Sequence, residues 1–323
     1  MARPFFLTLA LSGATLACAF GCGGEEEGPA QAGGSGQGGA ASELPYEPCP
    51  PGEAVGEFKI ALASDYTSVG GSVLDGVSPA KAKVEVARVG ACRLVKSENP
   101  LCDQACPGSA PLCAENNQCV AEPRTHDLGT VTVRGLVIPL EMSPKATKTY
   151  SNPPGLPHPG YEPGADLRII TSGGDYAPFE LRGWGVSLLE VGPEPVRVAH
   201  GQPSVISWLA PETEGPAWVH ASLNINFHGS NGAQIDCDFP DTGAAEIPAA
   251  LIDGLIAEGT TTDPTLTLTR RSATSLAIEP GCVEMLVLSE LALAIDVEGV
   301  ISCRDSSDCS EGQTCIPVEL FCE

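Results

Sequence analysis

The sequence predicts a mainly β protein, with one or more β-sandwich-like domains, small disulfide-rich modules and one short helix. The chain contains 29 Pro and 37 Gly but only 5% aromatic residues, and its 14 cysteines are clustered. Short alternating stretches separated by Gly and Pro are typical of sandwiches and barrels. The cysteine clusters contain too few apolar residues to form a core, so we expect disulfides to hold them.

Residues 1–21 have the layout of a secretory signal peptide. Arg3 supplies a positive charge, and an apolar run follows from Phe5 to Phe20. A basic start, a short apolar stretch and small residues are the features of such leaders. We therefore expect an exported protein.

The end of this leader resembles the lipobox of bacterial lipoproteins, in which a cysteine after small residues is acylated. Cys22 follows glycine and Cys18 follows alanine. Lipidation of Cys22 leaves an even number of cysteines to pair, whereas lipidation of Cys18 leaves an odd number, so we favour Cys22. The alternative is an ordinary secreted protein with a cysteine near its cleavage site.

Residues 22–48 are expected to form a lipidated flexible tether, because they are rich in Gly, Ala, Ser, Gln and Glu. Such a composition buries too little apolar surface to fold. Its mean reach of roughly 25–30 Å would lift the folded part away from a membrane. The expected location is the bacterial cell envelope, at the outer membrane or cell surface.

The formal net charge of −24 comes from 17 basic and 41 acidic residues. A chain this acidic repels nucleic acid, so we expect no nucleic-acid partner. Its carboxylates suit divalent cations and basic partners.

Beyond the tether, residues 49–150 read as a β-region with a cysteine-rich insert at 92–119. In the first alternating stretch, Ala82, Val84 and Val86 share one face, which predicts a half-buried strand. Residues 145–164 are polar and rich in proline, which indicates an extended linker or long loop. Residues 151–302 read as a β-sandwich-like domain, and the pattern leaves open whether 49–302 is one domain or two.

In this second region, short apolar stretches predict seven strands and one helix. The strands are Leu167–Ile170, Val186–Val191, Ser204–Leu209, Trp218–Phe227, Ala233–Phe239, Thr265–Arg270 and Val283–Val297. The helix is expected from Ile247 to Glu258, with Pro248 near its start and Gly259 after its end.

Twelve cysteines are expected to form six disulfides in the mature chain. They are Cys49, Cys92, Cys102, Cys106, Cys113, Cys119, Cys237, Cys282, Cys303, Cys309, Cys315 and Cys322. Each group must contain an even number of cysteines to pair completely. This favours three groups: Cys49 with the five cysteines of 92–119, Cys237 with Cys282, and the last four together. Connectivity within the larger groups stays open. The competing interpretation is zinc bound by four clustered cysteines.

The module at 303–323 has the spacing C-x5-C-x5-C-x6-C, and the cluster from Cys102 to Cys119 has C-x3-C-x6-C-x5-C. The segment from Cys303 to Cys315 resembles the short cysteine repeats of uncharacterised exported lipoproteins of the myxobacterial type. The arrangement of Gly90–Leu94, the Cys102–Cys119 cluster and Gly129–Leu136 is similar to one from the same group. The resemblance implies an envelope location and disulfides, and it assigns no activity. The spacer Ile316–Phe321 departs from it by lacking a glycine before the last cysteine.

Two candidate binding sites stand out. A polar ladder alternates with apolar residues in one strand, and its members are His220, Ser222, Asn224, Asn226 and His228. It can recognise a glycan or a peptide by hydrogen bonds, or be the solvated outer face of a sandwich. Asp236, Asp238 and Asp241 are spaced closely enough to suit calcium, although the glycine and terminal glutamate of an EF-hand loop are missing.

The three tryptophans, Trp184, Trp208 and Trp218, can stack on sugars but are more typical of core positions. The chain contains no nucleophile elbow, HExxH motif or phosphate-binding glycine loop. The sequence therefore favours a non-enzymatic envelope lipoprotein, acting in adhesion, scaffolding or extracellular partner binding. The alternatives are a carbohydrate- or calcium-dependent binding module and an envelope hydrolase with an unrecognised site.

Overall fold

The structure is a computed structural model that divides into two units, residues 1–42 and 43–323. It describes residues 46–78, 83–97, 101–114, 116–192, 194–213, 215–225, 232–259, 264–299, 303, 305–316 and 321–322. The leader, Cys18, Cys22 and most of the tether lie outside the described residues, as do Asn226 and His228. No helix in these ranges is long and apolar enough to cross a membrane.

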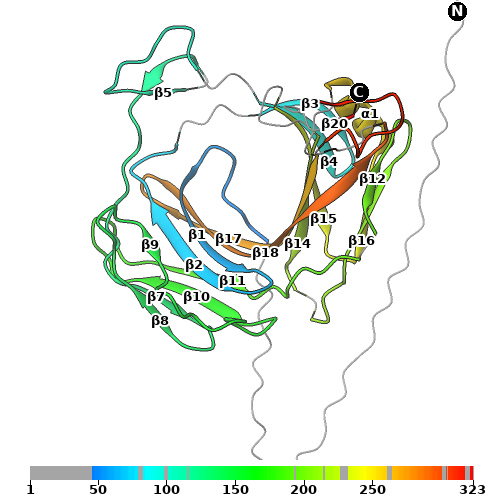
Figure 1. Ribbon diagram of the computed structural model, residues 1–323. Helices are drawn as coiled ribbons and strands as arrows, with labels where there is room; N and C mark the ends of the chain where they lie inside the picture. Colours follow the sequence, from blue (N-terminus) through cyan, green and yellow to red (C-terminus); the bar gives the residue numbers. More distant parts are fainter. Residues whose placement is uncertain are drawn as a thin grey trace, which may run out of the picture. The chain divides into compact units, whose positions relative to one another are not determined.

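The described chain is mainly β, as predicted, and its main feature is a ten-stranded sheet (Figure 1). Nine strands lie in the order β3 (Val84–Val89), β4 (Cys92–Lys96), β15 (Ala233–Pro240), β14 (Trp218–Asn224), β17 (Thr265–Ile278), β18 (Gly281–Val297), β1 (Ala54–Leu62), β2 (Thr67–Val73) and β9 (Tyr150–Ser151). The tenth, β12 (Val196–Val198), pairs in parallel with the end of β18.

A four-stranded sheet covers one half of the large sheet. Its order is β11 (Glu180–Trp184), β10 (Asp166–Thr171), β7 (Val131–Arg134) and β8 (Leu140–Met142). Alternate residues of the two sheets, such as Phe58, Ile169 and Met285, are fully buried between them. This half is the sandwich-like part of the fold.

The other half of the large sheet is covered by the antiparallel pair of β13 (Ser204–Ser207) with β16 (Ala244–Ile247) and by helix α1 (Ala249–Ala257), and side chains of β12 lie in the same core. The predicted helix is confirmed: Pro248 precedes its first turn, and Leu251, Ile252 and Leu255 are buried. Leu223, Ile235 and Leu268 of the sheet lie in the same core. In Figure 1 the two covering layers lie on the outer side of a bent sheet, which leaves its other face inside the bend.

The long β17–β18 hairpin joins the two cores. Val283 and Val287 of β18 belong to the first core, whereas Val297 lies in the second. In addition, β1 pairs with β18 and β4 pairs with β15. Residues 49–150 and 151–302 therefore contribute to one continuous sheet.

All twelve cysteines form disulfides, but the predicted Cys237–Cys282 pair is wrong, and so is the predicted group of Cys49 with the five cysteines of 92–119. Cys282 bonds to Cys49, and Cys237 bonds to Cys92. The sheet explains this, because Cys282 begins the part of β18 that pairs with β1, and Cys92 lies directly opposite Cys237 in the β4–β15 pair. The six disulfides indicate an exported protein.

The two small cysteine clusters have the same connectivity, which the sequence left open. Each bonds its first cysteine to its third and its second to its fourth; the four bridges are Cys102–Cys113, Cys106–Cys119, Cys303–Cys315 and Cys309–Cys322. In each module the third and fourth cysteines also lie opposite each other in a two-stranded sheet. These sheets are β5 (Leu112–Cys113) with β6 (Cys119–Val120), and β19 (Cys315–Ile316) with β20 (Phe321–Cys322).

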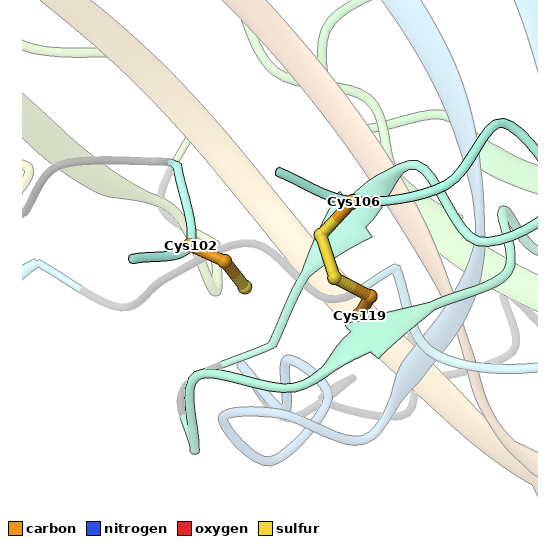
Figure 2. A group of neighbouring side chains, drawn as sticks. All are labelled: Cys102, Cys106 and Cys119. Atoms are coloured by element: carbon orange, nitrogen blue, oxygen red, sulfur yellow. A yellow bond between two sulfur atoms is a disulfide. The ribbon is translucent and has the colours of Figure 1, made fainter. Parts of the chain in front are cut away.

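The same disulfides bear on the alternative interpretation, in which clustered cysteines bind zinc. Figure 2 shows Cys102 beside the Cys106–Cys119 bridge, and the three sulfur atoms lie within 4.8 Å of one another. They are close because two disulfides are neighbours, since Cys102 bonds to Cys113. Zinc binds thiolates, and bridged sulfurs are not thiolates.

Two local predictions differ from the structure. The strand containing Val84 and Val86 is β3, whose six residues are all exposed because it lies at the edge of the sheet. The predicted strand Val186–Val191 makes only an isolated bridge between Val191 and Trp208, and the strand of this region is the earlier β11.

An exposed ionic cluster joins three loops around Asp175. Its carboxylate accepts hydrogen bonds from Lys148 Nζ at 2.9 Å and from the backbone N–H of Asp127 at 2.9 Å, and lies 3.1 Å from His126 Nδ1. These partners, Lys148 first, lower the pKa of Asp175 to about 2.

This low pKa predicts a pH dependence of stability. Because the unfolded pKa of aspartate is about 3.9, the contribution of Asp175 is fully present above that value and disappears as the pH falls through about 2. In unfolding titrations, wild type should exceed Asp175→Asn in stability at pH 5, and the difference should vanish near pH 2. A difference that does not change with pH would contradict this role of the carboxylate.

Candidate functional site

The two candidate sites of the sequence meet on the inner side of the bend. His220 of β14 lies opposite Asp238 of β15, and Ser222 lies opposite Asp236. The next strands add further polar side chains to this surface, which we call the polar face. Its members are His220, Ser222, Gln234, Asp236, Asp238, Thr269, Arg271 and Glu290.

Strand alternation creates this face, because successive residues of a strand point to opposite sides. In β14, Val219, Ala221 and Leu223 are fully buried in the core. Their neighbours His220 and Ser222 therefore point to the inner side. The same rule separates Arg270, which is buried on the core side, from Arg271 on the polar face.

Asp238 is the centre of the first polar group. His220 Nδ1 donates to its Oδ1 at 3.0 Å, and Arg271 donates to the same oxygen at 2.8 Å. Burial works to raise the pKa of Asp238, but the hydrogen bonds and charges of His220 and Arg271 outweigh it and hold the pKa below its usual value. Asp238 is therefore an ionised and occupied carboxylate.

Asp236 is the centre of the second group and is almost fully buried. It accepts hydrogen bonds from Ser222 Oγ at 3.1 Å and from Gln234 Nε2 at 2.5 Å, and Lys83 Nζ lies 3.9 Å away. Ser222 thus donates to a carboxylate rather than to His220. The hydroxyl and the imidazole do not form a nucleophile–base pair.

The polar face also has an aromatic end and an open donor. Tyr46 packs against Trp218 with ring centroids 5.7 Å apart. Burial raises the pKa of Tyr46, so its phenol stays protonated. Beside it, Arg271 Nε is buried and has no hydrogen-bond partner among the described residues. A buried donor without a partner is uncommon and indicates a place for a water or ligand oxygen.

The three candidate calcium ligands are not brought to one point. Asp236 and Asp238 lie on the polar face with the partners given above. Asp241 lies on the core side, where it pairs with Arg270 at 2.6 Å and accepts from Trp208 Nε1 at 2.7 Å. Each carboxylate therefore has its own donors, and the three do not converge on a cation.

The tryptophans divide between the two sides of the sheet. Trp208 is 5% exposed and belongs to the second core, as favoured from the sequence. Trp218 is partly exposed and lies at the aromatic end of the polar face. Trp184, also partly exposed, lines a cleft on the core side.

Sequence reasoning missed the contributions of β17 and β18 to the polar face. Thr269 donates to Glu290 at 3.1 Å across this strand pair, and Arg271 binds Asp238 across more than thirty residues of sequence. The alternation of Thr265, Thr267 and Thr269 was the available signal.

No family model and no curated protein matches the chain. Among solved structures, it is similar to a Ca²⁺-stabilised adhesin that helps an Antarctic bacterium bind ice, with 12% identity over 78% of this chain and a TM-score of 0.18. A 1.5-MDa bacterial ice-binding adhesin matches with 8% identity over 80% of this chain and 68% of its own, again with a TM-score of 0.18. The chain spans about half (51%) of the first adhesin's length. At such TM-scores no property of the adhesins is transferred to this protein.

Proposed function

We propose that this protein is a non-enzymatic, lipid-anchored protein of the bacterial cell envelope that binds an extracellular ligand through the polar face. The observation that carries the proposal is the buried, unpartnered Arg271 Nε beside the Tyr46–Trp218 pair. Lipidation at Cys22, membrane attachment and the resemblance to myxobacterial lipoproteins are part of the proposal. Adhesion and partner capture are the roles that fit such a surface.

Glycans are the ligand class that this face suits best. Its hydrogen-bonding groups are closely spaced along two strands, and an aromatic pair lies at one end. Sugar hydroxyls both donate and accept hydrogen bonds, and aromatic rings pack against sugar faces. The carboxylates are already paired with Arg271, His220, Ser222 and Gln234, which supports a calcium-independent mode of binding.

The contacts of Ser222 also support a binding role over hydrolysis. A serine nucleophile needs its hydroxyl within hydrogen-bond reach of a general base. Here Ser222 donates to Asp236, and His220 donates to Asp238. These groups hold each other in place instead of activating a nucleophile.

The binding test uses Arg271→Lys, which keeps the positive charge and removes the Nε donor. A panel of envelope polysaccharides is screened by thermal unfolding, where a ligand at 100 times its Kd adds about 2.7 kcal/mol. For a ligand that stabilises wild type, Arg271→Lys should weaken binding about ten- to a hundredfold, because a hydrogen bond to a charged group contributes about 1.5–3 kcal/mol.

Arg182→Lys is the matched control, since Arg182 is a half-exposed arginine on β11 that pairs with Asp166 away from the polar face. It should bind as wild type does. Equal affinity of Arg271→Lys and wild type would contradict the proposal, and so would a calcium-induced rise in the unfolding midpoint that Asp238→Asn abolishes.

A further inference from the structure

A cleft of about 480 Å³ lies on the core side of the sheet, where the two cores meet. Its walls come from β11, the segment after it, and residues 209–213. Binding sites occur preferentially at such junctions, and this volume lies within the usual range of about 300–1,000 Å³. The polar face lies on the opposite side of the sheet, so the cleft is a separate feature.

The floor of the cleft is electrically neutral and fully bonded. Arg270 and Asp241 form an ion pair at 2.6 Å, with side chains only 2% and 5% exposed. Arg270 also donates to Ser187 Oγ at 2.8 Å and to the carbonyl oxygens of Leu188 and Leu209 at 2.8 and 2.5 Å. This pair therefore offers no free charge to a ligand.

One wall of the cleft is the indole of Trp184. Ser272 Oγ donates to the carbonyl oxygen of Trp184 at 2.7 Å and fixes this end of β11 against β17. Gly215 lies so close that an added Cβ would stand 2.2 Å from Trp184 Nε1, and a Cβ on Gly164 would stand 3.4 Å from Cζ2 on the same edge of the ring. The backbone thus holds the indole along this edge.

The rim of the cleft is acidic and partly apolar. Glu162, Glu190 and Glu212 line it and are exposed, and none of them has a basic side chain within 4 Å among the described residues. Leu209, with 63% of its surface exposed, adds an apolar contact at the rim. The charge of the cleft therefore comes from three unpaired carboxylates around an aromatic wall.

We infer that this cleft binds an arginine side chain of a partner protein. A guanidinium ion stacks on an indole face and forms paired hydrogen bonds with carboxylates. It can therefore contact both the indole of Trp184 and the glutamates of the rim. The carboxylates alone would not select this ligand; the cavity and the fixed indole distinguish it from a metal ion, which makes no use of an aromatic wall. The net charge of −24 adds long-range attraction for a basic partner.

The test follows the indole N–H signals of the oxidised protein by NMR. The chain has three tryptophans, so three signals are expected, and Trp184→Phe identifies that of Trp184. The probe is Nα-acetyl-arginine methylamide, with the neutral citrulline analogue as its isosteric control. The arginine probe should shift the Trp184 signal in a saturable way, while the signals of Trp208 and Trp218 stay in place. The citrulline probe should shift none of them.

Two triple variants locate the site. Glu162→Gln, Glu190→Gln and Glu212→Gln together should weaken arginine binding about tenfold or more, because each ion pair adds a fraction of a kcal/mol to the stacking. Glu53→Gln, Glu122→Gln and Glu141→Gln change the net charge equally at exposed positions away from the cleft and should leave the affinity within about twofold.

Three results would overturn the inference: no shift at Trp184, an equal shift with the citrulline probe, or an equal loss of affinity in both triple variants. A shift of Trp184 caused by Ca²⁺ alone would assign the carboxylates to a metal and overturn it as well. The outcome is independent of the polar face, because Arg271→Lys should not change arginine binding in the cleft.

Discussion

Replacing Arg270 with methionine is expected to lower the free energy of unfolding by about 3–5 kcal/mol. Methionine has a similar volume, so the core stays filled, but Asp241 would remain buried without its cation. Its side chain is only 5% exposed, and Trp208 Nε1 would be its remaining side-chain donor. The carbonyl oxygens of Leu188 and Leu209 would lose a donor as well. Urea unfolding at neutral pH measures the change.

The neighbouring residue supplies the matched control. Arg271→Met removes a charge of the same kind from the next position of the strand, but its side chain is 26% exposed and its partner Asp238 keeps the hydrogen bond from His220. It should cost only about 1 kcal/mol.

Asp241→Asn, combined with Arg270→Met, should recover part of the lost stability, since the amide removes the buried charge and still accepts from Trp208. An Arg270→Met variant as stable as Arg271→Met would show that the buried pair contributes no more to stability than the exposed one.

Sequence reasoning succeeds where the pattern is contained in a single strand or helix. The alternation in β14 correctly placed His220 and Ser222 on one side and Ala221 and Leu223 on the other. That pattern is local, because within this one strand the polar residues point to the polar face and the apolar residues point to the core. The helix was found for the same reason, since its apolar positions lie within one nine-residue segment.

The sequence did not reveal the full length of β17, because the residue that balances the charge of Arg270 lies far away in the chain. The predicted strand ran from Thr265 to Arg270, and the sequence around Arg270 does not show that this arginine is buried and paired. In the structure the strand continues to Ile278, and Asp241, nearly thirty residues earlier in the chain, balances the charge. Nothing near Arg270 in the sequence identifies that partner.

The order of the strands in the sheet was the second feature that the sequence did not reveal. The valines of β3 alternate as a half-buried strand should, yet all its residues are exposed, because β3 is the end strand of the sheet and, within the described ranges, pairs only with β4. The composition of the polar face also depends on the order of the strands. Its candidate residues were visible in β14 and β15, but the neighbouring β17 that completes it with Arg271 follows from pairing alone.

Removing the Cys92–Cys237 bridge, by changing both cysteines to alanine, is expected to lower the free energy of unfolding by about 3–5 kcal/mol. The bridge closes a loop of 145 residues, and a long loop loses the most unfolded-state entropy when it is closed. Both cysteines are almost fully buried, so some packing is lost too. Denaturant unfolding of the oxidised proteins compares the variant with wild type.

The control removes a bridge that closes a short loop. Cys102 and Cys113 are only 11 residues apart, in a module with its own small sheet and outside both large cores. Changing both to alanine should loosen this module and leave the main unfolding transition within about 0.5 kcal/mol of wild type.

The contrast between the two pairs separates two roles of cysteine in this chain. Cys92 and Cys237 lie opposite each other in the large sheet and join an early strand to a late one, so they restrict how the sheet can open. The cysteines of the small modules replace a core that those segments lack. If both double variants lowered the main transition equally, the modules would be part of the cooperative unit; a smaller effect of the short bridge would show that they are attached to it and unfold separately.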